Sequence, residues 1–163
     1  MLDDVVATMV VLVLGVVGLA ALLRRLDEGD KRIVVVAFIG HVVAVFLQIF
    51  IIQYVYGGGD IDGYYRSGVE LANALRTDFE FIFPEAVRFF FHDAETNIPF
   101  LVFGGPGPTG SLTVIAAFLF YVLGDSLHAA SMVVALAAFF GKLALTQAMV
   151  QGQSNRVRRQ VFL

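Results

Sequence analysis

Residues 5–23 read VVATMVVLVLGVVGLAALL, and residues 33–56 read IVVVAFIGHVVAVFLQIFIIQYVY. The first run is uninterrupted, and the second is broken only by His41, Gln48 and Gln53. A helix needs about 20 apolar residues to cross the hydrocarbon core of a bilayer. Both runs therefore predict transmembrane helices.

The composition of the whole chain agrees with a membrane protein. Of its 163 residues, 58% are hydrophobic and 15% are charged, whereas ordinary soluble domains are about one quarter charged. The net charge is −3, and no basic stripe with interleaved aromatic residues indicates a nucleic-acid partner. The chain has no cysteine, which excludes disulfides, thiolate nucleophiles and cysteine-ligated metals.

Charges around the first two runs predict their orientation. Asp3 and Asp4 precede the first run, where a signal peptide would be basic, so we expect this helix to remain as an anchor. The connection RRLDEGDKR at 24–32 should face the cytoplasm by the positive-inside rule. The N-terminus and the polar loop 57–110 are then external. This loop holds eight acidic residues and three arginines, and its length invites a functional explanation.

Two further apolar segments follow the loop. Residues 109–123 are short for a span, a Gly-Asp-Ser turn occupies 124–126, and a longer apolar run covers 128–149. We interpret them as a helical hairpin, which brings the number of crossings to about four. This arrangement leaves Arg156, Arg158 and Arg159 outside, against the positive-inside rule. The conflict disappears if the short segment does not cross the membrane fully.

We therefore predict an all-α protein that forms a single membrane domain over residues 1–163, located in the plasma (inner) membrane. The final residues, RRQVFL, are typical of the start of a further apolar segment, which would begin at 160–163. We expect the chain to be part of a longer protein.

The external loop begins with three glycines and continues as DIDGYYRSGVELANALR. We expect Asp60 to be the N-cap of a new helix, with Asp62 in its first turn. Carboxylates at i and i+2 point in different directions, so one base and one structural cap fit better than an acid–base pair. A purely structural role for both is the alternative. The period of 3.6 predicts an amphipathic helix in the membrane interface with one face formed by Ile61, Tyr64, Tyr65, Gly68, Leu71, Ala72 and Leu75.

The second part of the loop, at 78–100, is rich in phenylalanine and includes the run 89–91. Most of these rings indicate an aromatic belt at the membrane interface. Arg88 and His92 are four residues apart, so we expect them to share a helix face, where they would meet an anionic lipid head group or solvent. The start of the loop has too few oxygen ligands on one helix face for a metal site, so no cofactor is expected. A bound divalent cation is the alternative.

Two ionisable residues stand out inside the apolar runs. Lys142 is a full charge at membrane depth, which makes a functional role the default, while its long stem also allows the ammonium group to reach the interface. His41 fits a hydrogen-bonded packing residue better than a proton relay. A transporter subunit would rest on these two residues alone, and neither has an opposite charge to pair with inside the spans.

The order of these features resembles the N-terminal part of polyprenyl-phosphate-sugar-dependent membrane glycosyltransferases of the C superfold. The resemblance covers the chain from about residue 33 to its end. It rests on a transmembrane helix, the pattern GGDIDGYY at 58–65, an amphipathic helix, the break GGPGP at 104–108 and the hairpin sequence LFYVLGDSLHAAS. Two features differ from the family: Ile61 separates acidic residues that are commonly adjacent, and whole enzymes have many more spans.

The resemblance implies an aspartate of the first external loop that acts as general base on an acceptor hydroxyl while the lipid phosphate leaves. Asp60 matches that position, and Asp62 is the substitute. The donor would be a polyprenyl-phosphate-linked sugar, and the acceptor a glycan, a lipid or a protein. The implied substrate-binding residues are Tyr64, Arg66, Arg88, His92 and Lys142. The cations among them would stabilise the departing phosphate.

Two functional expectations follow. The first is a hexosyl- or mannosyltransferase-like enzyme at the external membrane face, of which this part alone is not expected to be active. The second is a non-catalytic small membrane subunit or scaffold that docks a partner subunit or membrane lipids through its aromatic loop.

Overall fold

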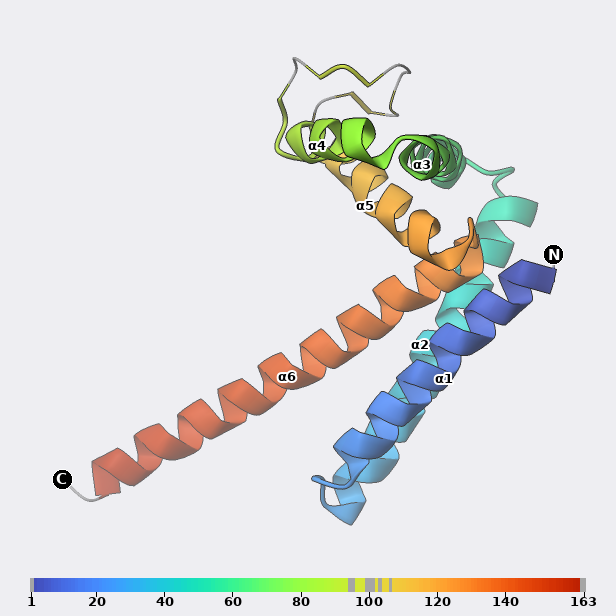
Figure 1. Cartoon of the computed structure of the whole chain (residues 1–163). Coiled ribbons are helices and arrows are strands. Elements are labelled where there is room, and N and C mark those ends of the chain that lie inside the picture. Colours follow the sequence, from blue (N-terminus) through green and yellow to red (C-terminus); the bar gives the residue numbers. More distant parts are fainter. Residues whose placement is uncertain (1, 94–95, 99–101, 103, 106, 162–163) are drawn as a thin grey trace.

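A computed structural model describes residues 2–161 apart from 94–95, 99–101, 103 and 106, and within this range it describes side chains from residue 3 to residue 149. The described residues form helices joined by turns and loops, without a strand, which confirms the all-α class. The helices are α1 (Leu2–Leu23), α2 (Glu28–Tyr54), α3 (Asp60–Thr77), α4 (Phe79–Phe90), α5 (Pro108–Leu123) and α6 (Leu127–Val161) (Figure 1).

Three helices of the described chain are long and apolar enough to cross a membrane. They are α1, α2 and the first part of α6, Leu127–Met149. The segment expected to form a fourth span is α5, which has 16 residues where a crossing needs about 20. The structure therefore holds three helices of spanning length, where the sequence led us to expect about four.

Contacts between these helices establish their directions. Along α1, Asp4 contacts Ser126, and Gly15 lies against Leu136 further along α6. The two helices therefore run parallel.

Helix α2 runs the opposite way. The rings of Phe46 and His128 lie 6.1 Å apart at the start of α6, and those of Phe38 and Phe139 lie 5.5 Å apart further along it. The far end of α6 consequently points to the end of the molecule that holds the 24–32 connection (Figure 1).

The core of α1, α2 and α6 depends on close helix approach. A Cβ atom added to Gly15 would lie 2.7 Å from Leu136 Cδ1, and one added to Gly18 would lie 3.2 Å from Phe140 Cζ. Small residues at a helix contact allow such backbone proximity. The buried residues of this core are Val11, Leu19, Val34, Phe38, Val45, Ile49, Ala129, Met132, Leu136 and Phe139.

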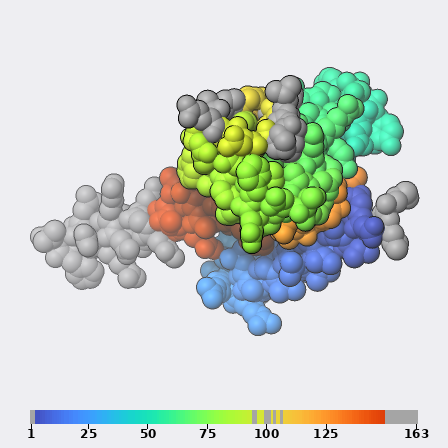
Figure 2. Space-filling model, turned by 45° about the horizontal axis from the view of Figure 1, so that its top comes forward, coloured from blue at the N-terminus to red at the C-terminus, as the bar shows by residue number. Residues whose placement is uncertain are grey.

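Helices α3, α4 and α5 form a second layer at the end where α1 and α6 begin (Figure 1), and α3 and α4 cover this end in the space-filling view (Figure 2). Leu71, Ala72 and Leu75 of α3 are completely buried, with α5 as the main neighbour of α3. A Cβ atom added to Gly68 would lie 2.8 Å from Phe120 Cε2 of α5. The predicted apolar face of α3 is confirmed, and another helix covers much of it.

The Gly-Asp-Ser turn between α5 and α6 joins both layers. Gly124 ends α5 in the left-handed conformation with φ 68°, which glycine adopts without strain. The Ser126 hydroxyl accepts the backbone N–H of Ala129 at 3.0 Å, as a helix N-cap does, and donates to the carboxylate of Asp4. Asp125 accepts hydrogen bonds from the Arg76 guanidinium of α3 at 3.0 and 3.2 Å. One short turn thus ties α6 to α1 and to α3.

Candidate functional site

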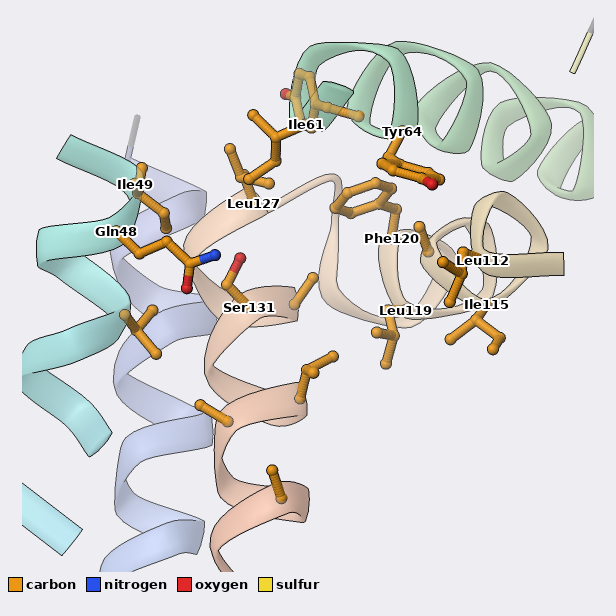
Figure 3. A pocket seen from close by; sticks show the side chains of 17 residues that line it. Gln48, Ile49, Ile61, Tyr64, Leu112, Ile115, Leu119, Phe120, Leu127 and Ser131 are labelled. Atoms are coloured by element: carbon orange, nitrogen blue, oxygen red, sulfur yellow. The ribbon is translucent and has the colours of Figure 1, made fainter. Parts of the chain in front are cut away.

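An apolar groove lies between the two layers of the molecule. Its volume is about 540 Å³, and its walls come from α2, α3, α5 and α6 (Figure 3). Helices α2 and α6 provide the side that continues into the three long helices, while Ile61 and Tyr64 of α3 lie at the other end. Further lining residues include Val45, Ile49, Leu112, Ile115, Leu119, Phe120, Leu127, Ala130, Val134 and Ala138.

Two polar side chains face the groove from the long helices. The amide of Gln48 on α2 and the hydroxyl of Ser131 on α6 point toward one another (Figure 3). Gln48 lies six residues before the end of α2 at Tyr54, about 9 Å along the helix axis. The groove therefore offers a polar spot below its upper end and apolar walls elsewhere, a pattern typical of sites for amphiphilic ligands.

Asp60 is the first residue of α3 and directly precedes Ile61, which lines the groove, but Asp60 is not itself a lining residue. The expected N-cap role of Asp60 is wrong: the cap is Gly59, and Asp60 is the first helical residue. The reason is that Gly57, Gly58 and Gly59 all have positive φ values, which turn the chain before the helix begins. Asp60 is exposed, and the described residues provide it with no hydrogen bond or ion pair.

Asp62 has a different environment. Its Oδ2 atom lies 4.0 Å from Arg66 Nη2, one helical turn onward. It also folds back over the glycine turn, since a Cβ atom added to Gly58 would lie 2.2 Å from Asp62 Oδ2. Both carboxylates lie at a helix N-terminus, which stabilises negative charge. Asp62 is thus engaged with its own helix, while Asp60 is exposed one residue before Ile61.

Arg88 is held by carboxylates of its own neighbourhood. Its Nε and Nη1 atoms donate to Asp93 Oδ2 at 2.9 Å and to Glu85 Oε1 at 3.1 Å. The hydrogen bond and charge of Asp93, together with Glu85, raise the pKa of Arg88 above its ordinary value. Glu85 is 8% exposed and accepts the backbone N–H of Asn97 at 2.5 Å. Arg88 therefore belongs to a network that ties α4 to the following loop.

His92 does not share a helix face with Arg88, and that expectation is wrong. Helix α4 ends at Phe90, and His92 has a left-handed backbone conformation with φ 68°. Its ring Nε2 lies 2.9 Å from Ser111 Oγ of α5, and that hydroxyl donates to the Phe90 carbonyl at 2.8 Å. The left-handed residue turns the chain out of the helix and directs the imidazole toward α5.

Lys142 is an exposed residue of α6 and lies apart from the two aspartates. It follows Leu127, the first residue of α6, by fifteen positions, which corresponds to about 22 Å along the helix. The last groove residue on this helix, Ala138, lies one turn before it. The structure thus brings Asp60, Asp62, Tyr64 and Arg66 together on the first two turns of α3, and places Arg88, His92 and Lys142 elsewhere.

The phenylalanine run is not a uniform aromatic surface. Phe89 is 6% exposed and packs in the core of the second layer, whereas Phe91 is 75% exposed. Three other rings of α4 remain accessible: Phe79, Phe81 and Phe83.

The described residues contain no group of three or more histidine, cysteine, aspartate or glutamate side chains placed to hold a metal ion. His41 has the contacts expected of a packing residue. Its Nδ1 lies 2.8 Å from the Ala37 carbonyl, and the centroids of its ring and that of Phe139 are 5.3 Å apart.

Comparisons with protein-family models, with curated proteins and with solved structures found no match to this chain.

Proposed function

We propose that the chain is the amino-terminal membrane part of a glycosyltransferase that takes a sugar from a polyprenyl-phosphate donor. One observation carries the proposal: Asp60 is exposed and directly precedes Ile61, which lines an apolar groove of about 540 Å³. The apolar walls of the groove suit an isoprenoid chain, and in this proposal the carboxylate of Asp60 meets the hydroxyl of an acceptor.

In this proposal Asp60 acts as general base. Its carboxylate accepts the proton of the acceptor hydroxyl, the hydroxyl oxygen bonds to the anomeric carbon, and the bond from that carbon to the lipid phosphate breaks with its electron pair on the phosphate. Positioned proton transfer of this kind contributes about 10²- to 10⁴-fold to a rate. The N-terminus of α3 and Arg66 provide positive potential on the same turns.

We expect Asp60→Asn to lower product formation by at least about a hundredfold, because the amide cannot accept the proton. The measurement is mass spectrometry of glycans and glycolipids from cells that carry the full-length gene with or without the substitution. Glu70→Gln is the matched control, since Glu70 is an exposed acidic residue of the same helix and should leave the product unchanged. Unaltered product with Asp60→Asn at equal protein abundance would remove Asp60 from the mechanism.

We also propose that the chain crosses the plasma membrane three times, with α3, α4 and α5 together on the external side. The parallel α1 and α6 support this topology, because the three arginines of the α6 end then lie on the same side as the basic 24–32 connection, in agreement with the positive-inside rule. The side chains of Arg156, Arg158 and Arg159 are outside the described residues.

Single cysteines test this topology directly, since the chain has none of its own. We expect a membrane-impermeant maleimide to label Glu70→Cys in intact cells and to label Gly29→Cys and Ser154→Cys only after the membrane is opened. Labelling of both Glu70→Cys and Ser154→Cys in intact cells would instead support four crossings.

A non-catalytic docking subunit is the second candidate. The accessible rings of Phe79, Phe81 and Phe83, which are 46%, 50% and 39% exposed, favour it. This candidate requires that Asp60→Asn leaves every product unchanged.

A further inference from the structure

A second groove lies between α1 and α6 at the opposite end of the long helices. The two helices are in close contact at Gly15 and Gly18, and α6 is largely exposed from Gly141 to Met149. The groove beside Gly18 has a volume of about 400 Å³. Its lining residues are Gly18, Ala21, Leu22, Arg25 and Phe140.

Arg25 is the charged residue of this lining, and the other four lining residues are apolar. Arg24 and Arg25 are both exposed, and no ion pair joins either of them to a carboxylate of the described chain. The nearby Glu28 is engaged by Lys31 at 2.5 Å. The groove therefore has apolar walls and an available guanidinium at its polar end.

We propose that this groove binds one anionic phospholipid, with an acyl chain between α1 and α6 and the phosphate at Arg25. The forked donors of a guanidinium match the oxygens of a phosphate. Basic pockets between spanning helices are suited to anionic head groups, whereas a zwitterionic head group gains less from the same charge. The site is independent of the glycosyltransferase proposal, because it lies at the other end of α1 from Asp4 and the second layer.

Native mass spectrometry of the purified full-length protein tests this site with phosphatidylglycerol and phosphatidylcholine of identical acyl chains. We expect phosphatidylglycerol to bind more tightly, and Arg25→Gln to weaken its binding about fivefold, the effect of one basic residue at an anionic membrane surface. Ala21→Phe should also weaken binding, since its ring fills the groove without changing charge. Ala21 is exposed, so the fold has room for the ring.

Arg32→Gln is the matched control, because Arg32 is an exposed arginine of the same end outside the lining, and it should leave binding unchanged. Equal binding of the two lipids would overturn the proposal. So would equal losses with Arg25→Gln and Arg32→Gln, which would indicate a diffuse basic surface. If Ala21→Phe alters the oligomeric state and leaves lipid binding intact, the groove holds a second copy of the chain rather than a lipid.

Discussion

We expect Gly110→Ala to destabilise the protein by about 3 kcal/mol, which for a chain of this size lowers the melting temperature by about 6 to 12 °C. A Cβ atom at this position would lie 2.0 Å from the Gly105 carbonyl oxygen and 2.5 Å from Phe89 Cε1. The carbonyl belongs to the turn that leads into α5, where Gly107 donates its N–H to Gly105 at 2.9 Å. Phe89 is buried in the core of the second layer, so its ring has little room to move away.

Circular dichroism at 222 nm in detergent micelles measures this change, and Gly141→Ala is its control. Gly141 is also a helical glycine, but a Cβ atom added there meets nothing within 4 Å. Alanine at an exposed helix position is preferred over glycine by about 0.5 to 1 kcal/mol, so Gly141→Ala should melt at or above the wild-type temperature. If Gly110→Ala melts with the wild type, the contact between α5 and the turn does not exist.

The second large effect is expected at Arg76. Its guanidinium donates to Asp125, to the Phe120 carbonyl at 2.6 Å and to the Tyr121 carbonyl at 3.4 Å. It therefore neutralises the C-terminal end of α5 and fixes the turn to α6. Since the side chain is 33% exposed, we expect Arg76→Ala to cost about 1.5 to 3 kcal/mol, the range for hydrogen bonds to a charged group.

Arg66→Ala is the matched control for Arg76→Ala on the same helix. Arg66 is 82% exposed, and its ion pair with Asp62 spans 4.0 Å, so the loss should stay below about 0.5 kcal/mol. The loss of stability for Arg76→Lys should fall between those of the two alanine variants, because an ammonium group lacks the planar fork that reaches the carboxylate and the carbonyls together. Equal melting temperatures for Arg66→Ala and Arg76→Ala would contradict the capping role of Arg76.

Local patterns predicted much of this fold. The apolar run 5–23 lies within α1, and the run 33–56 overlaps α2 except for its last two residues, because spanning length and hydropathy are properties of a continuous segment. The apolar face of α3 was also predictable, since Leu71, Ala72 and Leu75 recur with the helical period. The GGPGP break was placed correctly before α5, which starts at Pro108, although Pro106 lies outside the described residues.

Long-range contacts account for what the sequence analysis missed. Arg76 meets Asp125 across 49 residues, and Asp4 meets Ser126 across 122 residues. No periodic pattern encodes such pairs. The position of α5 was missed for the same reason: a 16-residue apolar helix is compatible with a short span or a packing layer, and the sequence does not show that α5 contacts α3 and α4.

The candidate site was predictable only in part. Asp60 and Asp62 were identified from the glycine turn and the start of a helix, and the structure has both in the first turn of α3, the helix that adds Ile61 and Tyr64 to the groove. The groove forms only where α2, α5 and α6 come together in the fold. The sequence therefore did not indicate that Gln48 and Ser131 would face one another. The partners of Arg88 were not predicted: Glu85 lies one turn earlier on α4, and the approach of Asp93 depends on where α4 ends.

The pairing of α1 with α6 has a consequence for the order of assembly in the cell. The hydroxyl that holds Asp4 is synthesised 122 residues after it, which at ribosomal rates of about 5 to 20 residues per second corresponds to roughly 6 to 24 s. During that interval the first helix waits in the translocon or the lipid with Gly15 and Gly18 uncovered. The contacts of Gly15 with Leu136 and of Gly18 with Phe140 can therefore form only after the last helix has been inserted.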